Sequence, residues 1–198
     1  MKILQLNIQS LTHNNNKQLL SMFLDKNAID VAILSEIWVL NNADCSILDY
    51  NFFCRPREDG YGGVGIYVRK NIQFSILKIE NDLEILGIKT LNLKSNFNIF
   101  SIYAPPSTTV SQFKSGTKKF FEFAASLDIP SIVGGDFNAR SSIWGSPICD
   151  RKGRSIENST REAGFICLND EMELLTGKSS KQKLRTATTS QLYYQCKA

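Results

Sequence analysis

The strongest constraint on the fold is a run of short β-rich segments between residues 47 and 103, which no helical pattern interrupts. Each segment is rich in β-branched and aromatic residues, and turn residues separate it from the next, which is typical of consecutive strands. The predicted strands of this meander are Ile47–Cys54, Val64–Val68, Phe74–Ile79, Leu83–Leu93 and Phe97–Tyr103.

Helices and further strands flank the meander on both sides. Apolar residues recur at helical spacing in two stretches, around Leu19–Leu24 and over 110–127, and residues 153–163 are compatible with a third helix. Asn14–Asn16 could cap the first of these helices. The remaining predicted strands are 2–8, 29–34, 129–133 and 165–168. This order predicts an α/β or α+β domain in which two mainly antiparallel sheets pack face to face, with helices outside.

The bulk properties suit one globular domain. The chain has 198 residues, and no apolar run approaches the roughly 18 residues that a membrane span needs. The first residues alternate polar and apolar, so they predict a strand and no signal peptide. Five cysteines without CxxC spacing indicate reduced thiols in an intracellular protein. A net charge of +4 is compatible with a nucleic-acid partner.

The C-terminal stretch differs from the rest. We place the domain at residues 1–175 and a divergent tail, which we expect to be poorly ordered, at 176–198. The tail is polar and basic, and Leu192-Tyr193-Tyr194 is its single apolar cluster. We expect no strand after Leu175, so that the sheets would lack their last strands.

The sharpest local signal follows a predicted buried strand and reads Gly134-Gly135-Asp136-Phe137-Asn138-Ala139-Arg140. On an extended backbone Asp136 and Asn138 would point to the same side. A carboxylate there could take a proton from an attacking water, and an amide could hold a phosphate oxygen. The ordinary alternative is a plain Gly-Asp/Asn turn.

Three other polar residues end predicted strands. Glu36, in Leu34-Ser35-Glu36-Ile37-Trp38, could hold Mg²⁺ with the help of waters, because one carboxylate is enough for that ion. Asn7 could orient a phosphate or the ligand carboxylate, and Tyr103, before Pro105-Pro106, could donate to a phosphate oxygen. The alternatives are a solvent-facing Glu, a strand-terminating Asn and a core Tyr. The Gly60–Gly65 stretch leads into a strand and lacks Gly-Lys-Ser/Thr, which excludes a P-loop.

The order of these motifs along the chain resembles the endonuclease/exonuclease/phosphatase family. Within that family the chain is most similar to the endonuclease domains of non-LTR retrotransposons of the insect type, over about Met1 to Asp170. The motifs are Asn7, Ser-Glu-Ile-Trp, Gly-Gly-Val-Gly-Ile-Tyr, Ile-Tyr-Ala-Pro-Pro, Gly-Asp-Phe-Asn-Ala-Arg, Trp144-Gly145, Asp150-Arg151-Lys152-Gly153-Arg154 and Cys167-Leu168-Asn169-Asp170.

The resemblance implies a four-layered α/β sandwich and metal-dependent phosphodiester hydrolysis that nicks target DNA. Glu36 would be the ligand of Mg²⁺, which Mn²⁺ could replace, and Asn7 would be its neighbour. Asp136 would position or deprotonate the attacking water. The remaining residues would bind the substrate: Tyr103 and Asn138 at the scissile phosphate, with Arg140 and Trp144 nearby.

Two family motifs are not found. The family expects a Ser-Asp-His near the C-terminus and a Ser-containing strand motif with an Asp before it, but the chain's one histidine is His13, in the loop after the first strand. The expected function is therefore an Mg²⁺-dependent DNA endonuclease domain of a retrotransposon, truncated at the C-terminus and impaired. The alternatives are an inactive nucleic-acid-binding relic, a phosphatase of small phosphoesters and a plain interaction domain. DNA would be the partner, the nucleus the location, and no membrane is expected; the oligomeric state is open.

Overall fold

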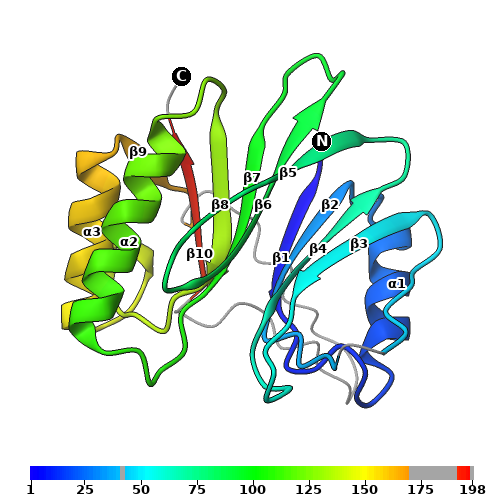
Figure 1. Ribbon diagram of the computed structural model, residues 1–198, viewed down its shortest axis with the longest axis horizontal. Helices are drawn as coiled ribbons and strands as arrows, with labels where there is room; N and C mark the ends of the chain where they lie inside the picture. The colour runs from blue at the N-terminus through cyan, green and yellow to red at the C-terminus, as the bar shows by residue number, and fades with distance from the viewer. Residues whose placement is uncertain (41–42, 170–190, 197–198) are drawn as a thin grey trace.

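Two sheets face each other, and helices cover their outer sides (Figure 1). The computed structural model describes residues 1–40, 43–169 and 191–196, the last range through its backbone. The layers run from α1 through the two sheets to α2 and α3, so the predicted sandwich of two sheets between helices is confirmed. None of the described helices is long and apolar enough to cross a bilayer.

The first sheet has four strands in the order β1-β2-β4-β3. Their bounds are β1 (Ile3–Asn7), β2 (Val31–Ser35), β3 (Tyr50–Arg55) and β4 (Val64–Arg69). β1 and β2 are parallel because helix α1 (Asn16–Lys26) returns the chain between them, and the other pairs are antiparallel. Asn15 stands at the N-cap of α1 in a left-handed conformation, and its side chain makes no capping hydrogen bond.

The second sheet has six strands in the order β5-β6-β7-β8-β10-β9. Their bounds are β5 (Gln73–Leu77), β6 (Glu84–Leu91), β7 (Asn98–Tyr103), β8 (Ser131–Asp136), β9 (Phe165–Cys167) and β10 (Gln191–Cys196). Among the described strands of this sheet, only β7 and β8 are parallel neighbours, and α2 (Val110–Ala125) connects them. Helix α3 (Arg151–Glu162) packs beside α2 on the outer face.

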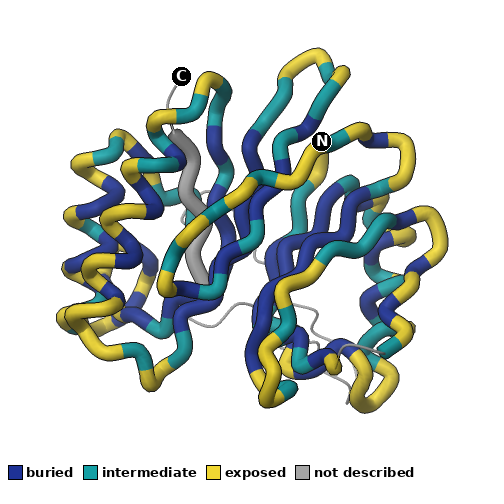
Figure 2. The backbone as a smooth tube through the Cα atoms, viewed as in Figure 1, coloured by how far each residue is buried: buried dark blue, intermediate teal, exposed yellow. Residues whose placement is uncertain are grey.

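Three apolar clusters hold the layers together. One lies between α1 and the first sheet, and another lies between the second sheet and its two helices. The third fills the space between the sheets with branched side chains from both, including Val31, Ile33 and Ile99. Figure 2 shows this buried centre in dark blue. The Ser101 hydroxyl also donates to the Leu34 carbonyl, 2.8 Å away, so one hydrogen bond joins the sheets within the apolar layer.

The structure corrects the expectation for the C-terminal tail. We expected no strand after Leu175, yet β10 lies between β8 and β9 and is antiparallel to both. Its register pairs Gln191 with Asp136, so the strand begins beside a candidate catalytic residue. The predicted boundary at residue 175 lies outside the described residues.

Two successive glycines make β8 narrow enough for its neighbours. A Cβ on Gly134 would lie 3.1 Å from the Ile33 side chain and 3.2 Å from that of Gln5, both on the facing sheet. A Cβ on Gly135 would lie 2.0 Å from the backbone oxygen of Ile102 in β7. Side chains can shift by a few tenths of an ångström, but a paired strand cannot, so Gly135 is the more constrained position.

We therefore expect Gly135→Ala to lower the free energy of unfolding by about 3 kcal/mol or more, since β7 and β8 must separate to admit the methyl group. Gly134→Ala, its neighbour on the same strand, should cost about 1 kcal/mol because flexible side chains can yield. Urea unfolding of both variants measures the difference. Equal losses would show that the β7–β8 contact does not limit residue 135.

Candidate active site

Four strands end at one edge of the sandwich, and each end carries a polar side chain. β1 ends at Asn7, β2 ends just before Glu36, β7 ends at Tyr103 and β8 ends at Asp136. The parallel pairs β1–β2 and β7–β8 put their carboxyl ends side by side, and β1 packs against β8 across the sheets. Residues distant in the sequence therefore meet at one edge, which is where α/β proteins commonly bind ligands.

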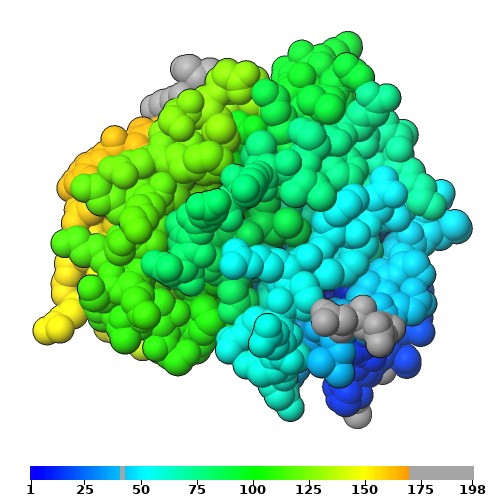
Figure 3. All heavy atoms as spheres, viewed as in Figure 1, coloured from blue at the N-terminus to red at the C-terminus, as the bar shows by residue number. Residues whose placement is uncertain are grey.

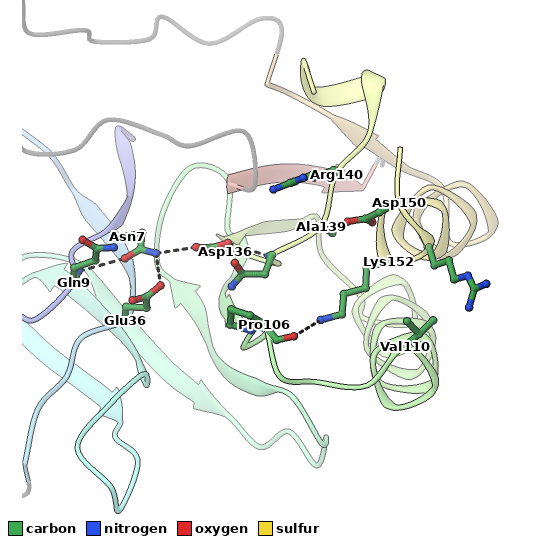
Figure 4. Close-up of a pocket in the computed structure, with 12 residues that line it drawn as sticks. Asn7, Gln9, Glu36, Pro106, Val110, Asp136, Ala139, Arg140, Asp150 and Lys152 are labelled. Atoms are coloured by element: carbon green, nitrogen blue, oxygen red, sulfur yellow. Dashed lines mark hydrogen bonds between the residues drawn. The ribbon is translucent and has the colours of Figure 1, made fainter. Parts of the chain in front are cut away.

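Asn7 joins the two acidic residues of this edge. Its amide nitrogen donates to Glu36 Oε1 at 2.7 Å and to Asp136 Oδ2 at 2.8 Å. The two carboxylates come from different sheets, so the amide bridges the sheets as well as the charges (Figure 4). Hydrogen bonds to ionised groups are stronger than neutral ones, and here they offset the repulsion between the carboxylates.

The backbone holds Glu36 in a conformation that most residues avoid. Its φ is +53°, in the left-handed region, which costs a non-glycine residue about 1 kcal/mol or more. The flanking chain is fixed on both sides, because Ser10 N donates to the Glu36 carbonyl at 2.9 Å and Ile37 N donates to the Gly63 carbonyl at 3.4 Å. The turn ends β2 and sets the Glu36 side chain beside Asn7.

Asp136 and Asn138 both reach the site, but through a turn. β8 ends at Asp136, and Asn138 has a φ of +47°, so the backbone is not extended between them as we predicted. The Asn138 backbone N–H donates to Asp136 Oδ1 at 3.0 Å, and its side-chain amide donates to the Ala104 carbonyl at 3.1 Å. The tight Asx-type turn that we weighed as the ordinary alternative is thus the structure that aims both side chains into the cleft.

An open cleft of about 740 Å³ extends from this edge towards α3. At one end lie Asn7, Glu36 and Asp136, and at the other lie the cations Arg140 and Lys152 (Figure 4). Arg151 also lines the cleft. The rest of the lining consists of Gln9, Pro106, Val110, Asn138, Ala139 and Asp150. Within the described residues, neither the Arg140 nor the Arg151 guanidinium has a hydrogen-bond or ion-pair partner that would occupy it. An acidic end suits a cation, and a basic end suits phosphates.

The start of α3 fixes the basic end. Asp150 caps the helix by accepting from Gly153 N at 2.6 Å, and its own N–H donates to the Arg140 carbonyl at 3.0 Å. A Cβ on Gly153 would lie 1.9 Å from that same carbonyl oxygen, so only glycine allows the helix to approach so closely. Lys152 donates to the Pro106 carbonyl at 3.1 Å, and burial lowers its pKa.

Two predicted site residues lie elsewhere. Trp144 is 4% exposed, belongs to the core beneath α2 and α3, and donates its indole N–H to the Ala139 carbonyl, so it shapes the loop and does not line the cleft. Tyr103 is 6% exposed and does not line the cleft either, although Glu36 and Asp136 are close enough to act on it. Burial first, and then those carboxylates, raise the pKa of Tyr103 well above its ordinary value, so the phenol keeps its proton.

We predicted no role for several of the residues that line the cleft. Asp150, Arg151 and Lys152 belong to a motif that carried the resemblance, and the Asp-x-x-Gly pattern of a helix start could have marked them. Gln9 and Pro106 gave no such signal, because their place depends on which strand ends meet. The chain's one histidine, His13, lies in the exposed β1–α1 loop and does not line the cleft.

Comparison with known proteins agrees with this geometry. The sequence model of the Endonuclease/Exonuclease/phosphatase family matches residues 4–191. The chain belongs to that family. Among curated members of similar sequence is the probable RNA-directed DNA polymerase from transposon BS of Drosophila melanogaster, which is 23% identical over 149 residues. That match covers 72% of this chain and 16% of the transposon protein, so the chain spans only a small part of that relative.

Solved structures in the family share the fold. The endonuclease domain of TRAS1, a telomere-specific non-LTR retrotransposon, superposes with a TM-score of 0.73 at 20% identity, covering 98% of this chain and 83% of that one. The AP endonuclease LMAP of Leishmania major gives 0.74 at 12% identity, covering 98% and 78%. D. rerio TDP2 complexed with single-strand DNA product gives 0.68 at 16% identity, covering 99% and 83%. These likenesses confirm the predicted fold of the family.

A buried acid beside the site gives a pH-dependent test. Burial raises the pKa of Glu84 above its ordinary value of 4.5, although hydrogen bonding from Gly63 N and the charge of Arg57 oppose the change. The folded chain therefore binds this proton more tightly than the unfolded chain, so the stabilisation is present below pH 4.5 and is lost as pH rises through the higher folded pKa.

We expect the stability of the wild type relative to Glu84→Gln to fall as pH rises from about 4 to about 7, because the amide cannot titrate. Urea unfolding at several pH values measures this difference. Glu80→Gln, which makes the same change at an exposed carboxylate, is the matched control. A flat profile for Glu84→Gln would contradict the effect of burial.

Proposed function

We propose that this chain is a divalent-metal-dependent DNA endonuclease domain that hydrolyses phosphodiester bonds. The observation that supports this most is the Asn7 bridge between Glu36 and Asp136, which faces a basic cleft end across open space. Carboxylate and amide groups are the donors that Mg²⁺ accepts, and arginine is the usual partner of a phosphate. A nucleic-acid backbone supplies a row of such phosphates.

The side chains present fit a magnesium site. Glu36 and the Asn7 amide oxygen offer hard oxygen ligands, and Mg²⁺ keeps several waters, so it needs few protein groups. The described residues contain no cluster of three or more His, Cys, Asp or Glu that could hold a metal, which disfavours a closed zinc-type cage. When bound, the ion would neutralise charge on the phosphate and on the leaving oxygen, and Mn²⁺ could replace it.

The chain's own residues would do the rest of the chemistry. Asp136 would accept a proton from the attacking water, while the Asn7 N–H keeps its carboxylate in place. Asn138 and Arg140 would hold the scissile phosphate, and Tyr103, whose phenol keeps its proton beside Glu36 and Asp136, would donate to it. Since chromosomal DNA would be the target, we place the protein in the nucleus.

We further propose that turnover is low. Among the described residues no imidazole lines the cleft, and losing one preorganised stabiliser of developing charge costs about 10²–10³ in rate. The same observation supports the second candidate, a domain that binds nucleic acid without cleaving it.

Nicking of supercoiled plasmid DNA tests catalysis. In Mg²⁺ or Mn²⁺ we expect slow conversion to the open circle, which a chelator stops. Glu36→Ala and Asp136→Ala should each reduce the rate by about 10²-fold or more, because each removes a group that acts on the reacting atoms. Glu80→Ala is the control, because it removes an exposed carboxylate that does not line the cleft, and it should nick as the wild type does.

Nicking that survives in both site variants would come from a contaminant or another site. A folded wild type that binds DNA and never nicks it would support the binding domain.

The salt dependence of DNA binding tests the basic end. We expect Arg140→Ala and Arg151→Ala each to reduce the slope of log K against log salt by about 0.9, because each removes one phosphate contact. Fluorescence anisotropy of a labelled duplex at several salt concentrations gives the slope. Arg154→Ala, an exposed arginine of α3 that does not line the cleft, should leave it nearly unchanged. Equal effects of all three would place the contact outside the cleft.

A further inference from the structure

Two aromatic rings are exposed on loops beside the acidic end of the cleft. Trp38 and Tyr61 meet edge to face, with ring centroids 5.4 Å apart and an angle of 72° between the rings. Tyr61 is 64% exposed, and Trp38 is half-buried. Leu40, 65% exposed, packs at the same tip, 2.9 Å from where a Cβ of Gly60 would stand. Large apolar side chains grouped on a surface commonly mark a binding site.

The backbone fixes the pair in place. Trp38 N donates to the Gly62 carbonyl at 3.0 Å, which continues the β2–β4 pairing beyond the ends of both strands. A Cβ on Gly62 would lie 3.2 Å from the Tyr103 ring, so the loop packs directly on the base of the active site. Figure 3 shows the β3–β4 turn, which carries Tyr61, as a projection at the lower edge of the molecule. The rings are thus held ready, which lowers the entropy lost on binding.

The position of the pair matches the path of a polymer. Trp38 follows Glu36 by two residues, and strand order puts both loops beyond β2, on the side away from β1 and β8. Arg140 lies at the opposite end of the cleft, which Arg151 also lines. A DNA strand that is cut at an internal phosphate continues in both directions, so one flank meets the arginines and the other must leave past Trp38 and Tyr61.

We propose that Trp38 and Tyr61 form a stacking platform for an unpaired DNA base next to the scissile phosphate, an inference that rests on the proposed function. Every base presents a π-face to such rings, so the contact tolerates any sequence. Charge should contribute little to DNA binding at this platform. The arginine in the same loop, Arg57, is already paired with Asp59 at 2.8 Å and lies 3.6 Å from Glu84. Loss of a ring should therefore weaken binding without changing its salt dependence, unlike loss of Arg151.

Tryptophan fluorescence reads the platform directly. The chain has two tryptophans, and Trp144 is buried, so quenching by a single-stranded oligonucleotide in the presence of a chelator reports on Trp38. We expect saturable quenching that Trp38→Phe removes, while DNA binding persists. Tyr61→Ala should weaken binding about tenfold at an unchanged salt slope, and Tyr61→Phe should restore it. Leu48→Ala, at an exposed leucine elsewhere, is the control and should bind as the wild type does.

The outcomes separate this inference from the proposed function. Quenching without plasmid nicking would support the platform and reject the nuclease. The opposite result would reject the platform and keep the nuclease. In that case the protein nicks DNA and binds it saturably, but binding does not quench Trp38, and Tyr61→Ala binds DNA as tightly as the wild type does. A pair that serves an apolar protein partner would give that second result, because DNA would not reach it. Circular dichroism of each variant confirms that it is folded.

Discussion

The cleft depends on one side-chain amide. Each N–H of Asn7 meets a carboxylate, one from each sheet, so the strand ends that carry Glu36 and Asp136 are joined at the point where the cleft begins. Two carboxylates so close would otherwise repel, and hydrogen bonds to charged acceptors are among the stronger ones in proteins. The apolar layer between the sheets sets their spacing, and the amide sets their alignment at this edge.

Two glycines, Gly135 in β8 and Gly153 at the start of α3, support the cleft from the second sheet and its helices. Gly135 lets β8 lie against β7, and Gly153 lets α3 approach the carbonyl of Arg140. Both are places where a single methyl group would meet backbone oxygen. The acidic and basic ends of the cleft therefore depend on these close backbone contacts as well as on the Asn7 amide.

Alternation and periodicity in the sequence predicted most of the elements, because burial on one face of a strand or helix leaves a regular pattern. The expected positions of Asn7, Glu36 and Asp136 at the ends of strands also marked them as candidate site residues. The turn at Asn138 was weighed against an extended backbone, and the sequence did not decide between them, since Asn occurs in both conformations. Trp144, which we expected near the substrate, is buried in the core, because position in a motif does not reveal which way a ring points. β10 was missed because its short apolar cluster, Leu192-Tyr193-Tyr194, follows a long polar and basic stretch without strand periodicity.

The pairing of β10 with β8 has a consequence for how the chain acquires its fold. Asp136 belongs to a strand whose outer neighbour comes from the far end of the sequence, whereas its inner neighbour, β7, is made earlier. During synthesis, one row of backbone groups on β8 stays unpaired until Gln191–Cys196 has been made. Such waiting edges invite pairing with other chains, and contacts between distant segments form slowly. Before Gln191–Cys196 is made, the open edge of β8 is therefore a place where the nascent chain can pair wrongly.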